Sequence, residues 1–159
     1  MPVQVGRWVF LSYRLPREPS APRLAIWRKV KRLGAAQLLD GLVALPLDSR
    51  NREQLEWLAD EVVEASGEAA IWIVEPATAA QEREIASALQ AKIAEEYRAI
   101  AAEARQASAQ PTGRHRRTLS RLRRELHRIR RRDYFPPSER DDAERAVAAL
   151  AERLEELAA

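Results

Sequence analysis

Ten arginines lie between residues 111 and 132, and they restrict the conformations that this stretch can adopt in a folded protein. Only one glutamate accompanies them, so the local charge is strongly positive. The apolar residues among them recur at intervals of three, four and three, which is typical of a helix with one narrow buried face. They are Leu119, Leu122, Leu126 and Ile129. The stretch therefore predicts a basic helix over residues 115–132 that packs along one side and exposes arginines elsewhere.

A second helix with the same spacing follows after a short connector, Tyr134 to Pro137. Its apolar residues are Val147, Leu150, Leu154 and Leu157, and residues 133–159 carry eight acidic and three basic side chains. Two helices with matching stripes and a short connector predict an antiparallel helical hairpin. We expect the hairpin to comprise the basic helix and an acidic helix over 138–158, with a long helix over 78–108 as a third member.

The first half of the chain alternates between strand and helix signals. The segments 8–13 and 70–74 are rich in β-branched and aromatic residues, and 36–47 is apolar around the turn dipeptide Asp40-Gly41, which indicates a hairpin. The order β-α-β-β-α-β is that of the ferredoxin-like fold. We therefore expect an α+β protein with a ferredoxin-like βαββαβ domain over 1–76, followed by a C-terminal three-helix region over 77–159 that contains the antiparallel hairpin.

The two helices of this domain carry their own boundary signals. Ser20 and Pro22 predict the start of the first, Gly34 its end, and Leu24, Trp27, Val30 and Leu33 its buried face. Asn51 followed by Gln54 resembles a capping box at the start of the second. Core packing is the expected role of Trp8, Trp27 and Trp72. Trp57 lies off the buried stripe of its helix, and we expect it either to pack under the C-terminal helices or to lie at a dimer interface.

The arginine helix is the strongest functional signal. Guanidinium groups match phosphate geometry, and so many like charges on one helix oppose its formation unless an anionic partner offsets them. We expect contacts with DNA or another polyanion; self-neutralisation by the acidic helix and docking of an acidic protein partner, such as a separate sensor domain, are the alternatives. The candidate contacts are Arg114, Arg116, Arg117, Arg121, Arg124, Arg128 and Arg131.

A second basic group lies on the first helix and in the loop before it. Arg28, Lys29, Lys31 and Arg32 are either a solvent face or an extension of the phosphate-binding surface. Arg14, Arg17 and Arg23 surround the predicted helix N-terminus, where an oxyanion could bind. An oxyanion-binding protein is therefore another alternative.

Catalysis has little support in the sequence. There is no cysteine, the two histidines are twelve residues apart, and no known catalytic or phosphate-loop motif occurs. We expect no enzyme activity, no metal and no cofactor. The chain start has no signal-peptide pattern and no apolar run approaches the ~20 residues of a membrane span, so we expect a soluble cytoplasmic protein with no membrane partner.

Several of these segments occur together in one known family. The run Tyr13 to Pro16, the segment Ser20 to Arg23, the helix Trp27 to Ala35 and the junction Asp133-Tyr134-Phe135-Pro136 resemble the N-terminal region of the chromate resistance protein ChrB family. The resemblance implies a chromate-responsive DNA-binding transcriptional regulator. Arg28, Lys29, Lys31, Arg32 and the arginines of 114–132 would then contact DNA.

The resemblance also bears on partners. Full-length family members carry a further C-terminal domain beyond this sequence, so we expect sensing of the chromate effector to have been lost or to reside in a partner chain. The chain is more distantly similar to the core domain of PaaX-type regulators, which shares the ferredoxin-like arrangement with CRISPR adaptation nucleases. Those nucleases place an Asp at the end of the first strand, where this sequence has Ser12-Tyr13-Arg14. We expect no nuclease activity, and a homodimer that covers the open sheet.

Overall fold

The computed structural model describes residues 6–159, which form two compact units. The first unit ends at Leu89 and the second begins at Gln90. The division lies thirteen residues beyond the expected boundary at residue 76 and falls inside the long helix α3 (Ala79–Ala109). None of the helices in the described part of the chain is long and apolar enough to cross a bilayer.

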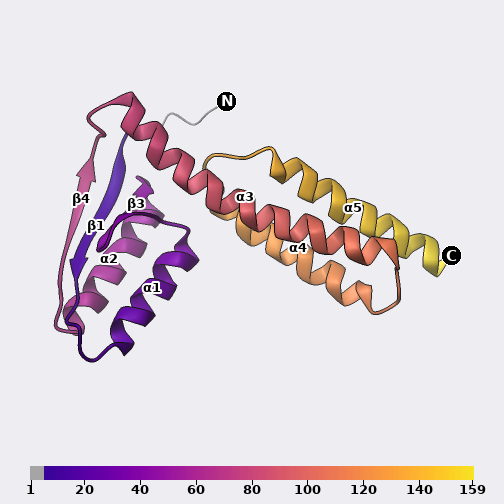
Figure 1. Ribbon diagram of the computed structural model, residues 1–159, viewed down its shortest axis with the longest axis horizontal. Helices are drawn as coiled ribbons and strands as arrows, with labels where there is room; N and C mark the ends of the chain where they lie inside the picture. The colour runs from indigo at the N-terminus through magenta and orange to yellow at the C-terminus, as the bar shows by residue number, and fades with distance from the viewer. Residues whose placement is uncertain (1–5) are drawn as a thin grey trace. The chain divides into compact units, whose positions relative to one another are not determined.

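The first unit contains a four-stranded antiparallel sheet with the order β2-β3-β1-β4. Its strands are β1 (Trp8–Arg14), β2 (Ala36–Leu39), β3 (Leu42–Pro46) and β4 (Glu68–Val74). Helices α1 (Ala21–Leu33) and α2 (Ser49–Glu64) cover one face of this sheet (Figure 1). The order and the two covering helices confirm the predicted ferredoxin-like βαββαβ arrangement.

Alternation along the central strands creates the core of the first unit. Val9 and Leu11 in β1 lie opposite Leu45 and Val43 in β3, and all four are fully buried. Successive side chains point to opposite faces of a strand, so these residues share the face that the helices cover. The helices contribute Ile26, Val30, Leu55, Leu58 and Val62 to the buried set.

Helix α1 is turned differently from the sequence-based expectation. Val30 is buried as expected, but its companion is Ile26, while Leu24 and Trp27 remain 47% and 43% exposed. Both sets fit helical spacing, so only contact with the sheet selects between them. Gly34 ends the helix in the left-handed conformation, as predicted.

Helix α2 begins earlier than the predicted capping box. Asp48 is its N-cap, and the Asp48 carboxylate accepts a hydrogen bond of 2.6 Å from the backbone N–H of Asn51. The Asn51 side chain is instead buried, and its Nδ2 donates to the carbonyl oxygen of Pro46 at 2.9 Å. The expectation that Asn51 caps this helix is therefore wrong, because the side-chain amide of Asn51 joins the helix to the end of β3.

The tryptophans divide into one core residue and three exposed ones. Trp8 is completely buried and its indole N–H donates to Glu82 at 3.2 Å. Trp72 is 54% exposed on the edge strand β4, where its indole N–H donates to the Ser12 hydroxyl at 2.9 Å. Core packing was therefore the wrong expectation for Trp27 and Trp72, and Trp57 is 55% exposed.

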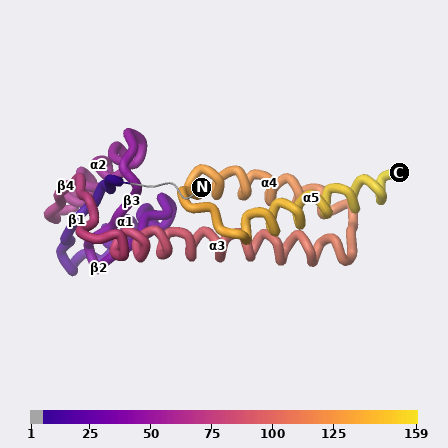
Figure 2. The backbone as a smooth tube through the Cα atoms, turned by 90° about the horizontal axis from the view of Figure 1, so that it is seen from above, coloured from indigo at the N-terminus to yellow at the C-terminus, as the bar shows by residue number. Residues whose placement is uncertain are grey.

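The second unit is a bundle of three helices. Residues 90–109 of α3 lie beside α4 (His115–Arg131) and α5 (Glu139–Ala158), and α4 runs antiparallel to both neighbours (Figure 2). These bounds agree with the predicted hairpin to within a residue or two. Its core contains residues of both predicted stripes together with α3 residues, including Tyr97, Ile100, Ala104, Leu122, Ile129, Leu150 and Leu154. Leu157, the last residue of the predicted α5 stripe, is 53% exposed, so the expectation that it is buried is wrong.

A buried carboxylate joins the α4–α5 connector to α3. The hydroxyl of Tyr97 donates to Oδ2 of Asp133 at 2.8 Å, and the Asp133 side chain is only 1% exposed. Burial raises the pKa of the Asp133 carboxyl above its usual 3.8, although the bond from Tyr97 opposes that rise. The folded protein therefore keeps this proton to a higher pH than the unfolded chain does, so ionisation of Asp133 opposes folding.

We expect Tyr97→Phe to weaken folding more at pH 7 than at pH 3. The variant removes the donor that stabilises the ionised carboxylate, so the pKa of Asp133 rises further. The free energy of unfolding should fall by about 1–3 kcal/mol at neutral pH. Urea denaturation of the wild type and the variant across this range measures the difference. An equal loss at both pH values would contradict this role, and Asp133→Asn, the control, should flatten the pH dependence between 3.8 and the raised pKa.

Candidate nucleic-acid interface

Helix α4 exposes its arginines because its few apolar residues all point the same way. Leu122 and Ile129 are buried in the bundle, and Leu119 and Leu126 pack against it. No acidic residue lies in the first turn, and Arg128, Arg130 and Arg131 occupy the last turn, where the helix dipole favours positive charge. The helix therefore has an apolar seam and a wide cationic surface.

Three of the ten arginines form ion pairs within the bundle. Arg121 donates to Glu125 at 2.7 Å and also to Glu103, and these hydrogen bonds raise the pKa of its guanidinium. Arg132 lies 3.2 Å from a Glu96 oxygen, and Arg130 lies 3.6 Å from Glu144. Among the described residues, the acidic helix α5 thus supplies only Glu144 to a direct ion pair with α4.

The other seven arginines have no carboxylate oxygen within 4 Å anywhere in residues 6–159, and all seven are exposed. They are Arg114, Arg116, Arg117, Arg123, Arg124, Arg128 and Arg131. We call this set the arginine face. Six of the seven were predicted contacts; Arg123 was missed, and the predicted contact Arg121 is held by Glu103 and Glu125.

The arginine face has a regular repeat that could have identified Arg123. Arginine pairs occur in α4 at 116–117, 123–124 and 130–131, so each pair follows the previous one by seven residues, and all of these residues except Arg130, which pairs with Glu144, belong to the arginine face. Seven residues are nearly two helical turns, so the pairs recur on one side of α4 about 10 Å apart. That side lies opposite Leu122 and Ile129, which face the core.

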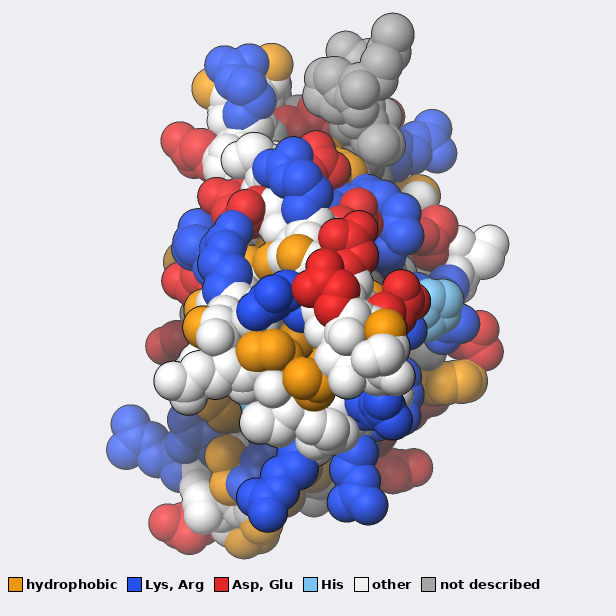
Figure 3. Space-filling view, turned by 90° about the vertical axis from the view of Figure 1, so that its right-hand side faces the viewer, with side chains coloured by type: hydrophobic (Ala, Val, Ile, Leu, Met, Phe, Trp, Pro, Cys, Tyr) orange, Lys and Arg blue, Asp and Glu red, His pale blue; other side chains and the backbone are white. Residues whose placement is uncertain are grey.

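Acidic side chains also reach the surface of the protein. Figure 3 shows red side chains among the blue ones on the face that it presents, with apolar side chains between them. In the bundle, Arg105 pairs with Asp142, and Arg98 lies 3.4 Å from Glu139. In the described part of the bundle, most of the positive charge without an acidic partner therefore lies on α4, although Arg145 of α5 also has no carboxylate oxygen within 4 Å.

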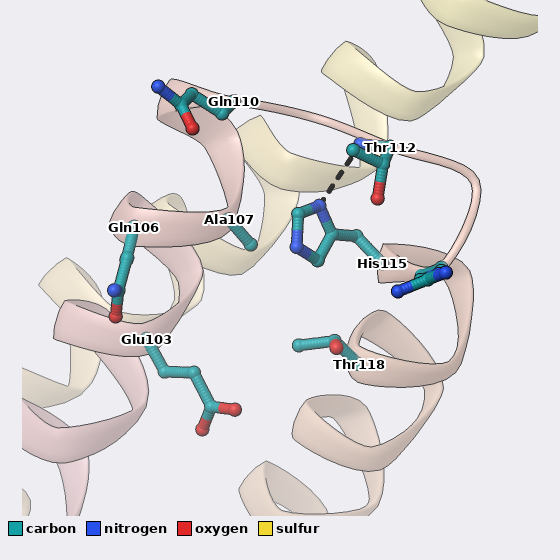
Figure 4. Close-up of a pocket in the computed structure, with 8 residues that line it drawn as sticks. Glu103, Gln106, Ala107, Gln110, Thr112, His115 and Thr118 are labelled. Carbon is teal, nitrogen blue, oxygen red and sulfur yellow. Dashed lines mark hydrogen bonds between the residues drawn. The ribbon is translucent and has the colours of Figure 1, made fainter.

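A polar pocket of about 540 Å³ lies at the turn between α3 and α4, beside the start of the arginine face (Figure 4). The Thr112 backbone N–H donates to Nδ1 of His115 at 3.1 Å, so Nε2 carries the proton when the imidazole is neutral. Glu103, Gln106 and Thr118 also line the pocket. Hydrogen-bond donors and acceptors thus lie next to Arg114, which lines the same pocket.

The predicted basic group on α1 lies in the first unit. Lys29 is engaged in an ion pair with Glu61, and the Lys31 ammonium lies 4.1 Å from the centre of the Trp27 ring. Arg28 and Arg32 are exposed, and no carboxylate of the described chain lies within 4 Å of them. Of the predicted group, Arg28 and Arg32 therefore make neither kind of contact within the described residues, and they lie one helical turn apart.

The three predicted oxyanion ligands line one groove of the first unit. Arg14 is engaged there with Glu68 at 2.9 Å. Arg17 and Arg23 have no such partner within residues 6–159. The structure therefore brings Arg14, Arg17 and Arg23 to one groove, although Arg14 is already paired with Glu68.

Comparison with known proteins places the chain in a family. A family model described as "Protein ChrB, N-terminal" matches residues 23–112, which is more than half of the chain. The protein therefore belongs to the ChrB family through this N-terminal region. Protein ChrB of Cupriavidus metallidurans is 35% identical to it over 77 residues, which are 48% of this chain and 24% of that relative. The match thus spans about a quarter of the relative's length.

The family match and the arginine face occupy different parts of the chain. The matched residues run from α1 through α3 and end at Thr112, before α4 begins at His115. The match includes Arg23, Arg28 and Arg32, but none of the α4 arginines. A role for the arginine face must therefore be argued from its own chemistry.

Proposed function

We propose that this protein is a DNA-associated regulator of chromate resistance that contacts DNA phosphates through the arginine face of α4. The observation that carries the proposal is the set of seven exposed arginines without acidic partners. Their mutual repulsion costs folding energy that a polyanion would offset. Membership of the ChrB family supports the link to chromate resistance.

The chemistry of the arginine face suits phosphate in particular. A guanidinium group presents a planar fork of donors that can hold two phosphate oxygens at once. A straight helix that repeats its arginine pairs every 10 Å or so can meet several phosphates along a duplex. Such contacts fix position and orientation without reading base sequence. The proposal gives the chain a binding role in the cytoplasm and no catalytic role.

The proposal is tested by fluorescence anisotropy with a promoter fragment from the protein's own operon and a scrambled duplex of equal length. We expect affinity to fall as salt rises, with a log–log slope of roughly −4 to −8, as several phosphate contacts predict. We also expect the promoter to outcompete the scrambled duplex. Chromate is then added to the promoter complex, where an effector of this chain or of a bound partner should change the affinity.

Each alternative result has a definite meaning. Equal affinity for both duplexes would remove the regulator and leave a general polyanion-binding protein. No binding at about 50 mM salt, where the electrostatic contribution is strong, would remove DNA altogether. The arginine face would then serve an acidic protein partner.

A further inference from the structure

A groove of about 880 Å³ opens on the first unit, between the end of β1, the start of α1 and the β2–β3 turn. Its walls include Tyr13, Arg17, Arg23, Leu24, Trp27 and Asp40. This volume lies in the range of small-molecule sites and is far larger than a tetrahedral oxyanion needs. The groove therefore suits a ligand with a body as well as a charge.

The β2–β3 turn is fixed against β1 at the edge of the groove. The backbone N–H of Tyr13 donates to the carbonyl oxygen of Gly41 at 2.8 Å. Gly41 has a φ of 78°, and a Cβ built there would lie 2.2 Å from the Tyr13 carbonyl oxygen. Only glycine allows this close approach, which keeps the neighbouring Asp40 carboxylate beside the groove. Burial is the main cause of a raised pKa of the Tyr13 hydroxyl; the charge of Asp40 adds to the rise, and the charge of Arg23 opposes it.

The apolar side of the groove includes two α1 residues that the sheet does not cover. Leu24 and Trp27 both line the groove and are nearly half exposed. Lys31 lies over the Trp27 ring and pairs with it as a cation–π contact. An exposed aromatic ring beside a leucine in a concave site is a surface that a planar ligand can cover.

The other side of the groove is cationic. Arg17 and Arg23 are exposed, and within residues 6–159 no carboxylate oxygen lies within 4 Å of either guanidinium. The first turn of α1 carries no acidic residue. Two free guanidinium groups close to an apolar wall favour an anion that is attached to a flat, apolar group.

We propose that this groove binds a free nucleotide. The base lies against Trp27 and Leu24, the phosphate is held by Arg17 and Arg23, and a ribose hydroxyl donates to Asp40. The site is separate from the arginine face of α4 and does not depend on DNA binding. It would give the protein a small-molecule ligand in addition to its proposed DNA partner.

The full chain is titrated with AMP, adenosine and inorganic phosphate, and binding is measured by isothermal titration calorimetry and by NMR amide chemical shifts. We expect AMP to bind with a Kd below about 1 mM, and adenosine and phosphate to bind at least tenfold more weakly. Arg23→Gln should weaken AMP binding at least tenfold and leave adenosine unchanged. Trp27→Leu should weaken both ligands, and Trp57→Leu, a second exposed tryptophan of this unit, should weaken neither.

Several results would overturn the proposal. No AMP binding at 10 mM removes the nucleotide site, and phosphate binding as strongly as AMP reduces the groove to an anion site. Adenosine binding as strongly as AMP would exclude Arg17 and Arg23 as ligands. Binding of a single-stranded DNA tetramer that requires Trp27, without AMP binding, would assign the groove to a nucleic-acid strand and not to a free nucleotide. Far-UV circular dichroism of each variant checks that it is folded.

Discussion

Replacing Arg117, Arg124 and Arg131 with glutamine should weaken DNA binding by roughly 500-fold at about 0.1 M salt. These residues follow one another at intervals of seven, and each lacks an acidic partner in the described chain. Each lost phosphate contact flattens the log–log salt dependence by about 0.9, so three contacts flatten it by about 2.7. Glutamine preserves helix propensity, so α4 should remain folded. Fluorescence anisotropy across a salt series measures both quantities.

A control with the same change in net charge separates the arginine face from general electrostatics. Arg98, Arg105 and Arg153 lie on α3 and α5, and each is paired with an acidic residue. Replacing these three with glutamine should weaken binding less than tenfold. If the two triple variants lost affinity equally, net charge and not α4 would govern binding. If neither lost affinity, the arginine face would not contact DNA.

The largest effect on stability is expected from Leu122→Ala. The Leu122 side chain is completely buried at the centre of the bundle, beside core residues from all three helices. Truncation to alanine removes apolar contacts and leaves a cavity, which typically costs about 2–5 kcal/mol. We expect the free energy of unfolding of the bundle to fall by about 3–4 kcal/mol within that range. Urea denaturation followed by circular dichroism measures the loss.

Leu157→Ala is the matched control for this variant. Leu157 continues the predicted stripe of α5, but it lies near the C-terminus and is 53% exposed. The same chemical change should cost less than about 0.5 kcal/mol there. Equal losses at both positions would show that Leu122 does not occupy the core of the bundle in solution.

The helical hairpin could be predicted in detail because its signals do not compete. The stripes of α4 and α5 are narrow. Pro111 and Gly113 interrupt the helical pattern before α4, and Pro136 and Pro137 interrupt it between α4 and α5. Helix α1 was harder, because Leu24 and Trp27 extend one possible stripe and Ile26 extends another. Both stripes share Val30, so the choice between them depends on the sheet, which is assembled from distant segments.

The candidate interface could be predicted as a helix but not residue by residue. The arginine count and the helical period were visible in the sequence. The engagement of Arg121 by Glu103 depends on the packing of α4 against α3, eighteen residues away, and a local pattern does not reveal that contact. In contrast, Arg123 could have been found, because it completes the second of the three arginine pairs.

The helix α3 has a practical consequence for dissecting the protein. It runs from Ala79 to Ala109 without a break, and the limit of the first unit at Leu89 lies within it. Proteases cut most readily in exposed, irregular segments, and a continuous helix offers none at this limit. Limited digestion should therefore not yield two clean fragments divided at Leu89. A recombinant fragment that ends there would have to be judged by whether its interrupted helix still forms.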